Sequence, residues 1–143
     1  MQGHIWVYCD RIVYTGDQLP ENLEKCEIVD CDSHYLVPGY IEPHVHPFQL
    51  YNPQTFTKYA SQTGTTTFIN DNLMMFLLSG KKKAFTLLKE LKKLPVTMYW
   101  WTRFDSQTEM VQEETTFSNR EVKSWLEHDA VIQGGELTAW PRL

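Results

Sequence analysis

From residue 40 onward, segments with the composition of β-strands alternate with segments of helical periodicity. The expected strands are rich in β-branched and aromatic residues, and they cover residues 40–45, 65–70, 96–101 and 130–133. The expected helices follow capping residues at Asn52, Ser79 and Ser118. Strands that alternate with helices pair in parallel through right-handed crossovers. The sequence therefore predicts an α/β fold with a parallel sheet.

Each expected helix also has a predicted buried face and its own end signals. Pro53 follows the first cap directly, Pro95 ends the second helix, and Ser118 with Glu121 forms a capping box. The apolar positions at helical spacing are Phe56, Tyr59, Ala60 and Thr63, then Ala84, Leu87, Leu88 and Leu91, and finally Val122, Trp125 and Leu126. Most lysines of the second helix lie opposite its leucines, which indicates a solvated face rather than a surface for nucleic acid or acidic lipid.

Polar side chains follow each expected strand at its C-terminal end. In order along the chain they are His44 and His46, Asp71 and Asn72, Arg103 and Asp105, and Glu136 and Thr138. Parallel α/β folds place their chemistry at this edge of the sheet. We therefore expect a site there, with Asp71, Asn72 and Arg103 as substrate-binding residues. In an alternative interpretation, Arg103 and Asp105 pair with one another and are purely structural.

The first strand ends in a candidate metal-binding pair, His44 and His46. In an extended strand, residues two apart point to the same side, so these two imidazoles could hold one divalent ion. Glu136 follows two glycines, where a ligand can approach closely, and its carboxylate could bridge two ions and serve catalysis. A bound metal would supply hydroxide near neutral pH. The alternatives are a polar loop with two histidines and a solvated loop carboxylate.

The first 37 residues have a different pattern, with predicted strands and turns but no predicted helix. We expect short strands at His4–Cys9, Arg11–Tyr14, Glu27–Cys31 and Tyr35–Val37, with turns at Thr15–Asp17 and Asp32–His34. These strands are too few to form an independent β domain.

Composition narrows the class of protein. The chain has 143 residues, of which 42% are hydrophobic and 22% charged, a profile typical of a globular protein with a real core. A net charge of −5 disfavours nucleic acid as a partner, and no apolar run predicts a membrane span. The three cysteines, the absence of C-x-x-C spacing and the lack of a visible secretory signal favour a reducing cytoplasm.

Several separated motifs resemble the amidohydrolase superfamily. The segment from Pro38 to His46 looks like its first-strand signature, and Gly64-Thr65-Thr66-Thr67 followed by an aspartate is similar to the adenine deaminases within it. Gly135-Glu136-Leu137 followed by Trp140-Pro141 is similar to them as well. The YerA-like group of Bacillus-type bacteria shares Tyr51-Asn52-Pro53-Gln54, Asn70-Asp71-Asn72-Leu73 and Gln133-Gly134-Gly135-Glu136.

This resemblance implies a (β/α)8 barrel, of which residues 39–143 form about the first half, and a β-sandwich to which residues 1–38 contribute strands. It implies a hydrolase acting on C–N bonds, which deaminates adenine or an N6-substituted adenine. His44, His46 and Glu136 carry over as ligands of divalent metal ions, expected to be two and to be manganese, iron or zinc. The expected partner is a small purine, and the intact protein is expected to be a homo-oligomer.

Two departures from the family pattern affect these expectations. Glu42 stands where an aspartate is usual, and Asp71-Asn72-Leu73-Met74 replaces an Asp-Pro-His-Glu run, which leaves the substituent of the purine open. The family's later histidine ligands and its proton-handling aspartate come from strands beyond Leu143. We therefore expect the chain to be an inactive fragment of a longer enzyme. The alternatives are a cyclic amide hydrolase of the same superfamily and a non-catalytic truncated remnant.

Overall fold

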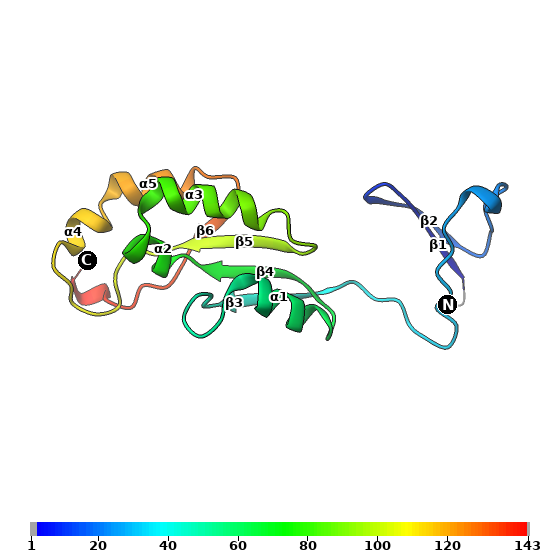
Figure 1. Ribbon diagram of the computed structural model, residues 1–143, viewed down its shortest axis with the longest axis horizontal. Coiled ribbons are helices and arrows are strands. Elements are labelled where there is room, and N and C mark those ends of the chain that lie inside the picture. Colours follow the sequence, from blue (N-terminus) through cyan, green and yellow to red (C-terminus); the bar gives the residue numbers. More distant parts are fainter. Residues whose placement is uncertain (1–2, 143) are drawn as a thin grey trace. The chain divides into compact units, whose positions relative to one another are not determined.

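The computed structural model describes residues 3–142 and divides into two compact units, Met1–Val37 and Pro38–Leu143 (Figure 1). None of the helices in the described part of the chain is long and apolar enough to cross a membrane.

The first unit is built on an antiparallel hairpin of β1 (His4–Tyr8) and β2 (Arg11–Gly16). The rings of Trp6 and Tyr14 face each other across the two strands, with centroids 4.5 Å apart. A short 3-10 helix, η1 (Leu23–Lys25), follows. The predicted strands at 27–31 and 35–37 are wrong, because those residues pair with no strand in the described chain. β2 also continues to Gly16, through the start of the turn predicted at Thr15–Asp17.

The second unit contains a four-stranded parallel sheet in the order β3-β4-β5-β6. Its strands are β3 (Tyr40–Val45), β4 (Thr65–Asp71), β5 (Thr97–Thr102) and β6 (Val131–Gly134). Each lies within one residue of its predicted position. The predicted α/β class and the parallel sheet are confirmed, since sequential strands are also neighbours in space.

Helices connect these strands (Figure 1). They are α1 (Pro53–Ser61), α2 (Leu73–Leu78), α3 (Gly80–Leu91), α4 (Glu113–Thr116) and α5 (Asn119–Leu126), with a last 3-10 turn, η2 (Trp140–Arg142). In α1 the cap forms as predicted, because the side chain of Asn52 accepts a hydrogen bond from the Thr55 amide at 2.8 Å. Gly64, with a φ of +94°, then turns the chain into β4.

The predicted capping box at Ser118 does not form. Ser118 occupies the N-cap position of α5, but its side chain makes no capping hydrogen bond. Glu121 points to α3 instead, where its carboxylate accepts from the Lys81 ammonium at 3.2 Å. This contact ties two helices together and replaces the local cap.

The core of the second unit lies where α3 and α5 pack on β5 and β6. Trp100, Trp125 and Leu88 are each 1% exposed, and Ala84, Leu91 and Val131 are buried with them. The predicted apolar faces are confirmed for α3 and for Val122 and Trp125 of α5. The predictions for Tyr59 and Leu126 are wrong, because these side chains are 74% and 43% exposed at helix positions outside the contact with the sheet.

Candidate metal centre

The strand register brings all four C-terminal strand ends to one edge of the sheet. Val45 lies opposite Asn70, Asp71 lies opposite Trp101, and Trp101 lies opposite Gln133. The residues that follow these positions therefore gather in one place. This geometry is what the alternation of strands and helices predicted.

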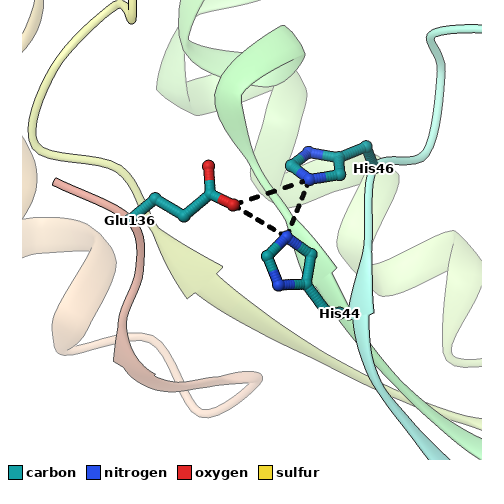
Figure 2. A group of neighbouring side chains, drawn as sticks. All are labelled: His44, His46 and Glu136. Carbon is teal, nitrogen blue, oxygen red and sulfur yellow. Dashed lines mark hydrogen bonds and ion pairs between the residues drawn. The ribbon is translucent and has the colours of Figure 1, made fainter. Parts of the chain in front are cut away.

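His44, His46 and Glu136 converge there (Figure 2). His44 Nε2 lies 2.8 Å from His46 Nε2 and 2.8 Å from Glu136 Oε1, and His46 Nε2 lies 3.7 Å from the same oxygen. His44 lies near the end of β3 and His46 directly follows that strand, whereas the carboxylate comes from the loop after β6. Residues 90 positions apart in the sequence thus present three ligand atoms to one point.

The donor set fits a divalent cation. His46 Nδ1 lies 2.8 Å from Asp71 Oδ2, and a carboxylate can only accept there, so the proton of this imidazole sits on Nδ1. His46 Nε2 therefore presents a lone pair toward His44 Nε2 and Glu136 Oε1, as a metal ligand must. Ligand atoms about 2.1 Å from one ion stand roughly 3.0–3.4 Å apart. The three observed separations bracket that range.

Behind the histidines lies a buried ion pair between Asp71 and Arg103, whose side chains are 3% and 0% exposed. Arg103 Nε lies 3.0 Å from Asp71 Oδ1, and Arg103 Nη2 lies 2.9 Å from Asp71 Oδ2. The same Nη2 lies 2.6 Å from Glu136 Oε2. Within residues 3–142, the buried Arg103 Nη1 has no hydrogen-bond partner. The Arg103–Asp71 contact has the two-point geometry that makes arginine–carboxylate pairs strong.

The structure places all three residues predicted to bind substrate, Asp71, Asn72 and Arg103, at this edge of the sheet, where they are buried. Asn72 is buried, its Oδ1 accepts from the Arg103 amide at 2.9 Å, and its Nδ2 donates to Thr102 Oγ1 at 3.3 Å. Asp71 and Arg103 contact the candidate ligands directly. Contact of these three with substrate stays a prediction.

Asp105 binds Thr138 and Ala139 rather than Arg103, the partner that the sequence suggested. Its carboxylate accepts from the Thr138 and Ala139 amides at 2.9 and 3.0 Å and from Thr138 Oγ1 at 2.6 Å. Pairing of Arg103 with Asp105 is therefore wrong. Burial alone would raise the pKa of Asp105, but the hydrogen bonds from Thr138, Ala139 and the Gln107 amide together lower it. Asp105 thus anchors the loop that carries Glu136.

Trp101 forms a wall of the site, although it is not among the site residues predicted from the sequence. Its ring meets His44 and His46 edge-on, with centroids 4.7 and 5.8 Å away. It also lies directly under Gly135, where an added Cβ would overlap its ring. The Gly134-Gly135 pair was the available signal, since glycine often marks close approach of the backbone to another group.

An open pocket of about 400 Å³ lies beside the histidines. It is lined by Glu42, His44, Val45, His46, Gln49, Leu50, Tyr51 and Phe56. Tyr51 and Phe56 stack within it at 4.7 Å between centroids. Its volume falls within the range of small-molecule sites.

Comparison with known proteins places this arrangement in a family. The profile of the amidohydrolase family matches residues 35–143. The chain belongs to the amidohydrolase family. All of the candidate ligands lie inside the matched residues, and the resemblance drawn from the sequence motifs is confirmed.

The curated relatives of this amidohydrolase chain have more specific names. It is 59% identical over 143 residues to a Bacillus cereus protein named "Putative adenine deaminase", covering all of this chain and 24% of that protein. It is 57% identical over 143 residues to "Putative adenine deaminase YerA" of Bacillus subtilis, covering 25% of it. A Picrophilus torridus relative, "Putative adenine deaminase PTO1085", is 38% identical over 97% of this chain and 24% of its own length.

The chain spans about a quarter of the length of the curated relatives it matches. No solved structure matches it.

Proposed function

We propose that the full-length protein is a metal-dependent hydrolase of C–N bonds that deaminates a 6-aminopurine, either adenine or an N6-substituted adenine. The observation that carries this proposal is the convergence of His44, His46 and Glu136 in a chain of the amidohydrolase family. The names of the relatives support the choice of adenine. In the net reaction, the oxygen of water bonds to C6, the C6–N bond breaks, and the amine leaves with a proton as ammonia or an alkylamine.

His44, His46 and Glu136 would hold the divalent ion, and two ions remain the expectation for the complete site. A bound metal lowers the pKa of water and so supplies hydroxide near neutral pH. Asp71 keeps the His46 proton on Nδ1, which directs the Nε2 lone pair into the site. Trp101 excludes water from the side of the pair on which it packs.

The purine would occupy the pocket beside the histidines. Tyr51 and Phe56 present aromatic surface there, and a planar ring can pack against such surface. We place the rest of the catalytic apparatus in the remaining length of the full protein, as part of a complete barrel with an accompanying β-sandwich. Lack of turnover by residues 1–143 alone and a homo-oligomeric state stay predictions.

The test is a substrate panel on the full-length protein purified without chelator. Release of ammonia or alkylamine would be measured with adenine and N6-methyladenine, and ring opening to the N-carbamoyl acids with hydantoin and dihydrouracil, before and after metal removal. We expect hypoxanthine from one or both of the aminopurines, and we expect its formation to stop when metal is removed and to return on readdition. Hydrolysis of the cyclic amides alone would replace the proposal with a cyclic amide hydrolase, and no turnover of any compound would reject both enzymatic assignments.

A further inference from the structure

We propose that Arg103 is a positioning residue that holds Glu136 and His46 in register with each other, through one guanidinium bound to two carboxylates. The inference rests on the proposed metal site, because Glu136 and His46 are two of its ligands. It assigns Arg103 to the support of the ligands, whereas the strand-end position suggested contact with substrate.

The first step is the contact with Glu136. Arg103 Nη2 lies 2.6 Å from Oε2 of this carboxylate, while Oε1 faces the two histidines. Glu136 lies beyond β6, in a loop, and its side chain is 27% exposed. A glutamate in such a place has several rotamers open to it. The charge-assisted hydrogen bond to Oε2 selects the rotamer in which Oε1 points into the site.

The second step is the contact with Asp71. Arg103 binds both oxygens of Asp71, and Asp71 Oδ2 in turn accepts the His46 Nδ1 proton. Arg103 therefore fixes the plane of the carboxylate that fixes the plane of the imidazole. The Nη2 nitrogen is shared between Asp71 Oδ2 and Glu136 Oε2, so one atom relates the two ligands to each other.

The third step is the rigidity of Arg103 itself. Its side chain is 0% exposed, its amide donates to Asn72 Oδ1 at 2.9 Å, and its guanidinium carbon lies 5.4 Å from the centroid of the Trp101 ring. A guanidinium held on several sides is pre-organised. A lysine ammonium keeps the charge but lacks the planar fork, so it cannot bind both carboxylates in the same geometry.

The experiment compares Arg103→Lys with the parent in the full-length protein by competition for Zn²⁺ or Mn²⁺ with a chelator of known affinity. Replacing a group that orients metal ligands typically costs about 10–100-fold in metal affinity. We expect a loss of that size in Arg103→Lys, although the charge is retained. The absorption spectrum of the Co²⁺-loaded variant should also change, because the ligands would be arranged differently.

Leu88→Ala is the matched control for loss of stability. Leu88 lies on α3 and is 1% exposed in the core, so its truncation destabilises the second unit without touching the candidate ligands. We expect the folded Leu88→Ala protein to keep the metal affinity of the parent. A milder replacement, Leu88→Val, serves if Leu88→Ala does not fold, and Asp71→Asn serves as the second probe of the network if Arg103→Lys does not fold.

A double-mutant cycle between Arg103→Lys and Asp71→Asn tests the connection through Asp71. If both residues act on His46 through one network, the loss of metal-binding free energy in the double variant should be smaller than the sum of the losses in the two single variants. Unchanged affinity in both variants, alongside loss of binding in His44→Ala/His46→Ala, would overturn the inference and leave the proposed function standing. Retention of metal by the histidine variant itself would overturn both.

Discussion

The two units of the chain show what a histidine needs around it to become part of a site. In residues 3–37 no side chain is buried, and the hairpin of β1 and β2 joins neighbours in the sequence. His4 and His34 lie there as exposed residues. In residues 38–142 a buried core holds four parallel strands whose C-terminal ends meet, and there His44 and His46 lie within reach of Glu136. Parallel pairing with a core, rather than a surplus of histidines, creates the candidate site.

The largest expected effect separates the two units by their stability. Trp125 is 1% exposed and packs on Phe76 and Phe85, so Trp125→Ala should lower the local free energy of unfolding by about 3–5 kcal/mol. Trp6→Ala should cost about 1 kcal/mol or less, because Trp6 packs mainly on Tyr14. Hydrogen exchange would measure both effects. The amides of β5 and β6 should lose protection in Trp125→Ala and keep it in Trp6→Ala. Equal losses of unfolding free energy in Trp125→Ala and Trp6→Ala would contradict the expected difference in stability between the two units.

A smaller effect is expected at the glycine beneath Glu136. An added Cβ at Gly135 overlaps the buried Trp101 ring, so Gly135→Ala should displace the Glu136 loop and weaken metal binding on the order of 10-fold. Gly134→Ala is the control, because its Cβ would meet only the outer ring atoms of the half-buried Phe104, at 2.7 Å. Titration with a chelator would compare them. Equal affinities in Gly135→Ala and the parent would show that Glu136 is not held by this close approach.

The smallest effect concerns pH and the anchor at Asp105. Because the pKa of Asp105 in the folded protein lies below the usual aspartate value of 3.8, its stabilising contribution is complete above that pH and is lost as the pH falls through the pKa of the folded state. Asp105→Asn should reduce the exchange protection of the Thr138 and Ala139 amides by about 1 kcal/mol at neutral pH. The difference from the parent should shrink in acid. A difference that stays constant below pH 3.8 would contradict this assignment.

Much of the second unit could be predicted because its signals are periodic and local. Composition located all four strands, and the leucine spacing located the buried face of α3. The short helix α4 was missed because it is a single turn with no repeat of apolar residues, and α2 because Leu73–Leu78 is apolar on every face. The strand predicted at 27–31 was wrong although its sequence does alternate as a strand does. It does not form because no described segment pairs with it.

The candidate ligands could be predicted from the sequence, whereas the residues that support them could not. The rule that parallel strands present chemistry at one edge assembled His44, His46 and Glu136 from distant positions. The rule says nothing about the direction of each side chain. Whether Arg103 would bind Asp105, two residues away, or Asp71 on the neighbouring strand depends on packing that only the structure shows.

The central claim is that His44, His46 and Glu136 form a metal site and that the histidines of the first unit do not. The most direct measurement is the metal content of full-length protein purified without chelator, by elemental analysis, for the parent, His44→Ala/His46→Ala and His4→Ala/His34→Ala. We predict that bound divalent metal falls sharply in the first variant and equals that of the parent in the second. Unchanged metal content in His44→Ala/His46→Ala would contradict the account.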